Sequence, residues 1–143
     1  MNPNEKDVRD ATTELAARVR REQAPDRFLA RAALVGLGRL ELEQEGTGKP
    51  LALELIEAAK PVQEAWVEAV EAELTMACTE HVRSVDPRYL DKPIYDFEYT
   101  IAARERLEAR LIAAGLLDLE VPEKLLDQVA EADRVLAPYL EKR

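Results

Sequence analysis

Hydrophobic residues recur along most of this chain at the spacing of a helix. The longest run follows Pro50, with apolar residues three or four positions apart. Its members are Leu51, Leu55, Ala59, Val62, Trp66, Val70, Leu74 and Ala77. Because Pro61 removes one backbone hydrogen bond, we expect this helix to bend just before Pro61 or to split there into two. Trp66 is the candidate for the centre of the core.

A shorter helix is predicted at the start of the chain. Asn2 is a suitable N-cap, Pro3 fits the first helical position, and Glu5 is placed to reach back as a capping box. We expect this helix to run to about Gln23, because the residue before Pro25 is pushed out of the α region. Its apolar stripe consists of Val8, Ala11, Leu15 and Val19.

Asp26 is the expected N-cap of a second helix, which extends through Glu45. Its apolar side carries Leu29, Ala33, Leu37 and Leu40, with Phe28, Ala32 and Val35 beside them. Gly36 and Gly38 each cost about 1 kcal/mol inside a helix, which predicts the close approach of another helix. A hairpin over residues 39–56 is the alternative, since "RLELE" and "LALEL" alternate around "EGTGKP". Helices are favoured, because Leu, Glu and Ala are good helix formers.

The helical pattern is lost from about Val82 to Pro93, where "RSVDPRYLDKP" is expected to be an irregular connector. It resumes with Tyr95, Tyr99, Ala103, Leu107, Leu111 and Ala114, and Gly115 fits a Schellman-type stop. Pro122 then opens a last helix with Leu125, Val129, Ala132, Leu136 and Leu140. Five or six helices with short connectors predict an all-α fold, a single-domain helical bundle spanning residues 1–143.

Composition agrees with a folded, single-domain protein. The chain has 143 residues, of which 47% are hydrophobic and 34% charged. Its lone cysteine cannot form an internal disulfide and favours a reducing compartment. The start "MNPNEKDVRD" has no apolar h-region, and no 18 apolar residues run together. We therefore expect a cytoplasmic protein with no membrane partner.

The net charge of −9 is concentrated in one segment. Residues 41–73 hold nine acidic and two basic side chains, whereas residues 1–40 hold six acidic and eight basic ones. Such a field repels nucleic acid and attracts a basic protein partner. Six arginines lie between positions 18 and 39, namely Arg18, Arg20, Arg21, Arg27, Arg31 and Arg39. Pairing of these arginines in one copy of the chain with the acidic segment of another would form a homo-oligomer.

Carboxylates repeat along the long helical run. Glu57, Glu64, Glu68 and Glu71, with Glu54 nearby, are expected on one helix face. Di-iron proteins use such repeats, but they also need Glu-x-x-His from two helices, and the only histidine here directly follows Glu80. A solvated acidic face turned to a basic partner is therefore favoured.

"EGTGKP" at residues 45–50 is close to a phosphate-binding loop in composition only. That motif needs glycine at position 43, where Glu43 stands, and Ser or Thr after Lys49, where Pro50 stands. Gly46 as a helix stop and Pro50 as a helix start explain the segment without a ligand.

Cys78 and His81 are three positions apart and share a helix face. Together they would supply two of the four ligands of a zinc site, or they would form a thiolate–imidazole pair. Further ligands would come from Asp86, Glu80 or a second subunit. For catalysis, Cys78 would need a lowered pKa, and no glycine-rich turn follows it to supply backbone donors. The expectation is a buried thiol beside a helix-end histidine, with no metal, no cofactor and no enzymatic role. A small helical enzyme or metal-binding protein centred on these residues is the alternative.

An aromatic cluster completes the candidates. It comprises Tyr89, Tyr95, Phe97 and Tyr99, with Arg88 and Lys92 between them. Tyr and Arg are enriched at contact hot spots, and the prolines at 87 and 93 stiffen the loop that presents them. We expect Tyr89 at the surface and Tyr99 at the edge of the core.

"YLDKPIYDF" followed by "LEARLIAAGLL", within residues 89–117, resembles the helical hairpin of nitrile hydratase β subunits. There, a tyrosine-rich segment precedes a helix that ends in Gly-Leu. The resemblance implies a helix at this place and nothing about activity.

These patterns favour a non-catalytic interaction module, either an adaptor or a subunit. Its expected binding residues are Arg88, Tyr89 and Tyr95 in the 83–99 loop and Glu57, Glu64, Glu68 and Glu71 on the acidic face. An inhibitor or immunity-type protein that mimics acidic nucleic acid is a further alternative, since it would use the same charge.

Overall fold

Helices make up nearly all of the described chain. The computed structural model describes residues 1–92 and 97–141. Its elements are α1 (Pro3–Arg20), α2 (Arg27–Glu43), α3 (Gly48–Ala59), the 3-10 turn η1 (Lys60–Val62), α4 (Gln63–Ser84), the short α5 (Pro87–Leu90), α6 (Phe97–Leu116) and α7 (Glu123–Glu141). The described residues contain no strand, so the all-α prediction is confirmed and the alternative hairpin over residues 39–56 is wrong.

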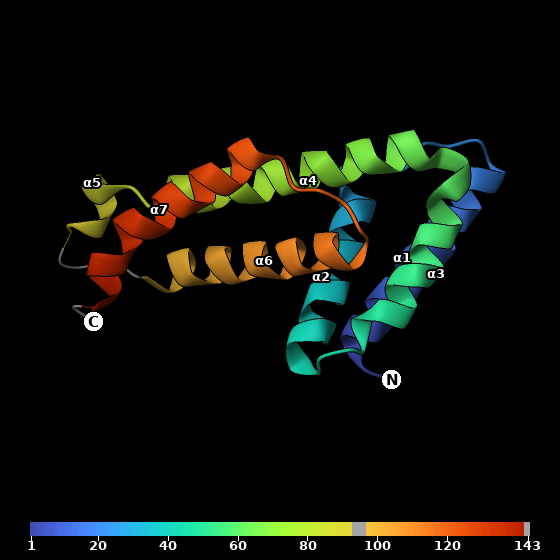
Figure 1. Cartoon of the computed structure of the whole chain (residues 1–143), viewed down its shortest axis with the longest axis horizontal. Helices are drawn as coiled ribbons and strands as arrows, with labels where there is room; N and C mark the ends of the chain where they lie inside the picture. The colour runs from blue at the N-terminus through green and yellow to red at the C-terminus, as the bar shows by residue number, and fades with distance from the viewer. Residues whose placement is uncertain (93–96, 142–143) are drawn as a thin grey trace.

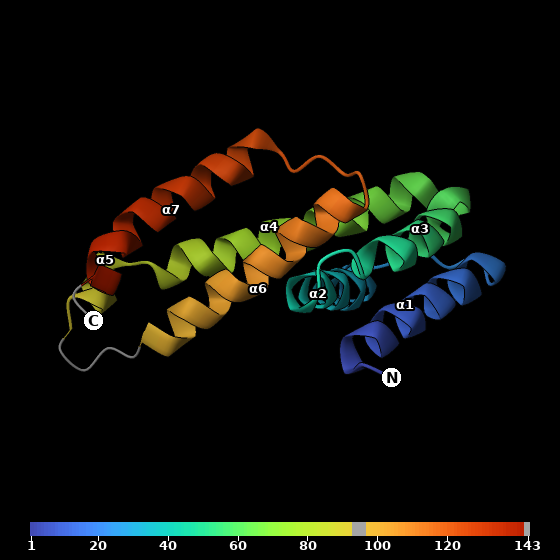
Figure 2. The same ribbon diagram turned by 60° about the horizontal axis from the view of Figure 1, so that its bottom comes forward.

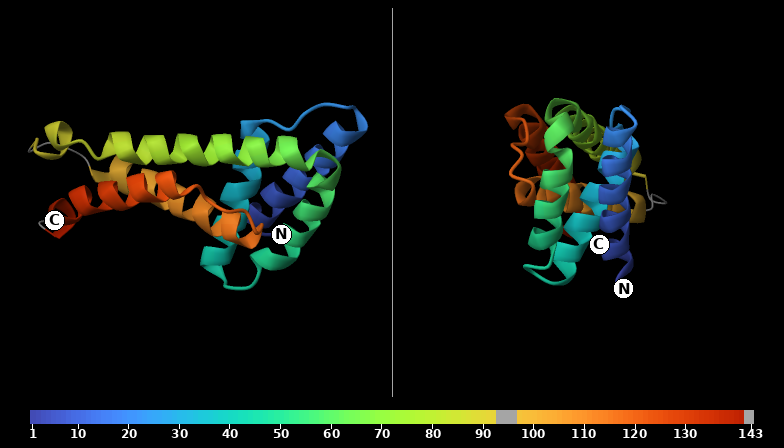
Figure 3. Two further views of the ribbon diagram at one scale, coloured as in Figure 1. Left: turned by 45° about the horizontal axis from the view of Figure 1, so that its top comes forward. Right: turned by 90° about the vertical axis from the view of Figure 1, so that its right-hand side faces the viewer.

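The helices form an elongated bundle. α4, α6 and α7 lie along the long axis, whereas α1, α2 and α3 run at a steep angle to them at one end (Figure 1). The view along the long axis places α1, α2 and α3 side by side (Figure 3). No described helix is both long and apolar enough to cross a membrane.

Side-chain caps define the starts of α1 and α2. Asn2 accepts a hydrogen bond from the N–H of Asn4 at 2.7 Å, and Asp26 accepts one from the N–H of Leu29 at 2.9 Å. The expected capping box at Glu5 is not formed. Its carboxylate accepts instead from Arg9 one turn later, at 3.1 Å.

Schellman motifs end α1 and α6. In α6, the N–H of Leu119 donates to the carbonyl of Ala114 at 2.9 Å, and Asp118 adopts the left-handed conformation with φ 56°. The predicted motif is therefore present, but Gly115 lies inside the helix. α1 stops at Arg20, three residues before the predicted end, with Glu22 at φ 57°.

The long helical run splits at its proline, which is one of the two outcomes expected from the sequence. α3 ends at Ala59, the 3-10 turn holds Pro61, and α4 begins at Gln63. α3 and α4 consequently meet at a sharp corner (Figure 2). The predicted acidic face is divided by this corner, since Glu57 belongs to α3 and the later glutamates belong to α4.

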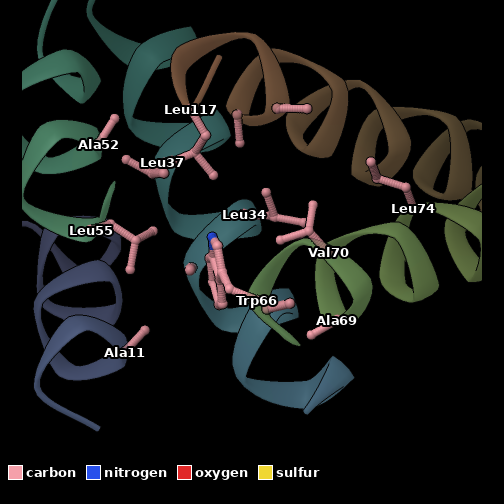
Figure 4. Packing of buried hydrophobic residues seen from close by; sticks show 14 of the residues in the cluster. Ala11, Leu34, Leu37, Ala52, Leu55, Trp66, Ala69, Val70, Leu74 and Leu117 are labelled. Atoms are coloured by element: carbon pink, nitrogen blue, oxygen red, sulfur yellow. The ribbon is translucent and has the colours of Figure 1, made fainter. Parts of the chain in front are cut away.

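Trp66 lies in the main hydrophobic core, where only 2% of its surface is exposed. Leu34 and Leu37 of α2, Leu55 of α3 and Val70 of α4 lie in the same core (Figure 4). Phe28, expected beside the apolar stripe of α2, is 61% exposed, and Ala32 is exposed as well. They fall on the side of α2 that none of the described helices covers.

Two glycines bring α2 unusually close to its neighbours. A Cβ atom on Gly38 would lie 1.8 Å from the carbonyl oxygen of Ala109 in α6. A Cβ atom on Gly36 would lie 2.9 Å from the carbonyl oxygen of Asn4 in α1. The predicted close approach is confirmed at both positions, and α2 packs closely between α1 and α6.

Replacing Gly38 by alanine should therefore destabilise the protein. The added methyl group has no room beside the α6 backbone, so α2 and α6 must move apart, at a net cost of about 2 kcal/mol. Gly115→Ala is the matched control. It lies in α6 with nothing within 4 Å of a Cβ atom, and should stabilise by about 0.5–1 kcal/mol.

Urea unfolding followed by the fluorescence of Trp66, the only tryptophan, measures both effects. An unchanged or increased stability of Gly38→Ala would contradict the close contact.

Candidate functional site

A buried carboxylate joins three helices. Glu73 of α4 is only 1% exposed and accepts hydrogen bonds from three arginines. Arg110 Nε of α6 donates at 2.9 Å, Arg31 Nε of α2 at 3.0 Å, and Arg27 Nη1 of α2 at 3.4 Å. We call these four residues the Glu73 cluster. Charge-assisted hydrogen bonds of this kind are what a carboxylate needs in order to be buried.

The helix periods explain why these side chains meet. Glu73 is seven positions after Trp66 and three after Val70, which turns it toward the interior with them. Arg110 follows Leu107 by three positions and lies on the buried side of α6. The sequence contains a signal for this cluster, because Glu73 and Arg110 are charged residues on two apolar stripes. The sequence interpretation missed it because it treated Glu73 only as part of the acidic segment.

Positive charge exceeds negative charge around the cluster. Burial lowers the pKa of Arg110, and the neighbouring Glu73 opposes that shift. Next to the cluster, Arg106 of α6 forms an ion pair with Glu80 of α4. Five arginines, including Arg83 of α4, lie around three carboxylates, those of Asp7, Glu73 and Glu80.

A cavity opens beside this group of charges. It has a volume of about 240 Å³ and is lined by Arg31, Glu73, Met76, Ala77, Thr79, Glu80, Arg83, Tyr99 and Arg110. We call it the arginine cavity. A second cavity of about 390 Å³ shares Arg31, Glu80 and Arg110 with it and adds Asp7 and Arg106. The two cavities are therefore neighbours, with wall residues from α2, α4 and α6 in common.

The acidic residues singled out in the sequence lie elsewhere. Glu64, Glu68 and Glu71 are exposed along α4 and have no ion pair within the described part of the chain; we call them the acidic stripe. Glu57, across the corner in α3, pairs with Lys60 at 2.6 Å. The expected single face of four glutamates is thus corrected to a stripe of three.

The arginines of residues 18–39 do not form one patch. Arg27 and Arg31 bind Glu73, and Arg18 binds Glu14 and Asp26, each at 3.1 Å. Two of the six, Arg27 and Arg31, thus pair with a carboxylate of the acidic segment within the chain.

Cys78 and His81 are both completely buried in α4. His81 Nε2 lies 2.9 Å from Asp133 of α7, which also accepts from Arg104 of α6 at 3.1 Å. Since a carboxylate only accepts, His81 donates through Nε2, and its Nδ1 has no partner among the described residues. Burial raises the pKa of the Cys78 thiol, the opposite of what a nucleophile needs.

The other proposed ligands are not brought to this pair. Glu80 is bound to Arg106, and Asp86 caps α5 and pairs with Arg88 at 2.7 Å. Within residues 1–92 and 97–141, no three His, Cys, Asp or Glu side chains are close enough to share a metal ion.

The described part of the 83–99 segment, residues 83–92 and 97–99, is more regular than expected. α4 continues to Ser84, and α5 forms a single helical turn. Arg88 and Tyr89 are exposed, as expected for a contact site, whereas Tyr95 lies outside the described residues. Phe97 packs near Tyr139 with ring centroids 6.4 Å apart. Tyr99 is 56% exposed, so the expectation that it belongs to the core edge is wrong.

The "EGTGKP" loop is closed by a side chain of the protein itself. The N–H groups of Gly46 and Gly48 donate to the carboxylate of Glu41 at 2.8 and 3.1 Å. Glu41 therefore takes the place that an anion would occupy at the start of α3. Gly46 has φ 90°, in agreement with its predicted role after the helix stop, and Pro50 lies in the first turn of α3.

Comparison of the chain with protein-family models, with curated proteins and with solved structures finds no match. The function is therefore argued from the geometry alone.

Glu73→Gln should destabilise the protein strongly. The substitution keeps the shape but leaves the buried Arg110 without its counter-charge, at a cost of about 3–5 kcal/mol. Glu71→Gln, two residues away and exposed, is the matched control and should change the stability by less than about 0.5 kcal/mol. Equal unfolding midpoints in urea for the two variants would contradict the structural role of Glu73.

Cys78 should react slowly with an aromatic disulfide reagent in the native protein. Its raised pKa leaves little thiolate near neutral pH, and burial blocks access. We expect the rate to increase strongly in denaturing urea and to rise with pH, because the thiolate is the reacting form. Fast labelling of the native protein at pH 7 would instead favour the catalytic or metal-binding alternative.

Proposed function

We propose that this protein is a non-catalytic interaction module, an adaptor or a subunit, that binds a basic partner protein through the acidic stripe. The main supporting observation is that Glu64, Glu68 and Glu71 are exposed and unpaired within the described chain. Exposed carboxylates with no internal counter-ion attract a positively charged surface and steer its approach. The lone cysteine makes the cytoplasm the proposed compartment.

The stripe is also well suited to a rigid contact. Its residues are spaced by four and three positions on α4, so they follow one another along the same helix face. The opposite face of that helix holds Trp66, Val70 and Leu74 in the core, which fixes the orientation of the stripe. Little conformational entropy of the backbone is therefore lost when a partner binds.

Arg88 and Tyr89 form a second proposed contact point, beyond the far end of α4. The carboxylate of Asp86 holds Arg88 through its Nη2 and its backbone N–H, which restricts this exposed side chain. Glu71 lies 13 positions before Ser84, the last residue of α4, which is a rise of about 20 Å, so the two contact points would engage separate parts of a partner.

Peptides that bind the wild-type protein, selected from an unbiased display library, test the proposal. We expect basic sequences among them. Their affinity should fall roughly tenfold for the variant Glu64→Gln, Glu68→Gln, Glu71→Gln, because each exposed ion pair contributes less than about 1 kcal/mol. It should also fall with added salt.

The matched control removes three exposed carboxylates elsewhere, by Glu120→Gln, Glu123→Gln and Asp127→Asn. This variant has the same net charge as the stripe variant, so it should retain the binding if the stripe is the site. Equal losses of affinity in both variants would mean that binding depends only on the net charge, which would contradict the proposal. Competition between nucleic acid and this protein for a basic partner would instead favour the alternative of an inhibitor or immunity-type protein that mimics acidic nucleic acid.

A further inference from the structure

The arginine cavity has the opposite charge to the rest of the molecule. Around the cavity and its neighbour, Arg27, Arg31, Arg83, Arg106 and Arg110 outnumber Asp7, Glu73 and Glu80. The local excess is two positive charges in a chain whose net charge is −9. Since Glu73 and Glu80 are already bound by arginines, the cavity has donors left over.

Two of the arginines have unused donors. Arg31 binds Glu73 through Nε, and its terminal nitrogens have no partner among the described residues. The exposed Arg83 has neither an ion pair nor a hydrogen bond in the described part of the chain. A guanidinium group has five N–H donors, and its fork geometry suits a carboxylate.

Apolar side chains flank these donors. Met76 of α4 is 48% exposed and Tyr99 of α6 is 56% exposed, and both line the cavity. Phe28, 61% exposed, lies close by, with the guanidinium groups of Arg27 and Arg31 at 4.4 and 5.5 Å from its ring centre. Aromatic residues, Met and Arg are the types enriched in protein contact surfaces.

The size of the cavity favours side chains over a metabolite. Its volume of about 240 Å³ lies below the roughly 300–1,000 Å³ of small-molecule pockets. A carboxylate together with a neighbouring apolar side chain matches both the volume and the mixed lining.

We propose that the arginine cavity docks an acidic segment of a partner protein. A carboxylate of this segment pairs with Arg31 and Arg83. An apolar side chain next to it lies against Met76 and Tyr99. This surface is distinct from the acidic stripe and binds the opposite kind of partner.

The same unbiased peptide library tests this proposal. Among the selected peptides we expect a group rich in Asp and Glu that also contains Leu or an aromatic residue. Arg83→Gln and Tyr99→Ala should each weaken this group about fivefold or more, since hot-spot residues contribute more than about 1 kcal/mol. Their matched controls are Arg21→Gln and Leu53→Ala, an exposed arginine and an exposed apolar side chain outside the cavity, which should change the affinity less than about twofold.

Three results would overturn the proposal. The first is the absence of acidic peptides, or acidic peptides that bind Arg83→Gln and Tyr99→Ala as tightly as the wild type. The second is displacement of the peptides by inorganic phosphate but not by chloride of equal ionic strength, which indicates a simple anion site. The third is a dimer of the free protein that Arg83→Gln dissociates in sedimentation, which means that a second copy covers the cavity.

The acidic-stripe variant separates this proposal from the proposed function. It should lose the basic peptides and keep the acidic ones, whereas Arg83→Gln should do the reverse. Failure of one group of peptides therefore leaves the test of the other unaffected.

Discussion

The close packing of α2 at Gly36 and Gly38 is the constraint on which the remaining structure depends. Only a residue without a side chain lets α2 approach the backbones of α1 and α6 so closely. This approach makes α2 central, with Ala33, Leu34 and Leu37 fully buried. It also places the first turns of α2 near α4, where Arg27 and Arg31 reach Glu73. The Glu73 cluster therefore depends on the absence of a Cβ atom at Gly36 and Gly38.

Two charged junctions then fix how the long helices are aligned. Glu73 connects α2, α4 and α6, and Asp133 connects α4, α6 and α7 through His81 and Arg104. Contacts between Leu and Ala side chains tolerate a helix sliding by one turn at moderate cost, whereas the buried polar groups of these junctions, Glu73 and His81, tolerate no loss of their partners. We infer that these junctions select one alignment of the bundle from several of similar hydrophobic energy.

α4 organises the surface as well as the interior. Its outer side carries the acidic stripe, its buried side carries Trp66, and its flank contributes Met76 and Arg83 to the arginine cavity. One rigid helix therefore presents surfaces of opposite charge at a fixed separation. The histidine and cysteine of the same helix lie in the core.

The sequence by itself determined the helices, their caps at Asn2 and Asp26, the split at Pro61, the burial of Trp66 and the need for close approach at Gly36 and Gly38. These features depend on local spacing and backbone chemistry, which a single sequence contains. It did not determine that Tyr99 and Phe28 are exposed, or that Glu73 is buried among arginines. Those outcomes depend on which helix covers which face, and helix period alone does not specify the neighbour. Only the tertiary structure brought Arg27, Arg31, Glu73 and Arg110 together, because their attraction acts between segments up to 83 positions apart, from 27 to 110.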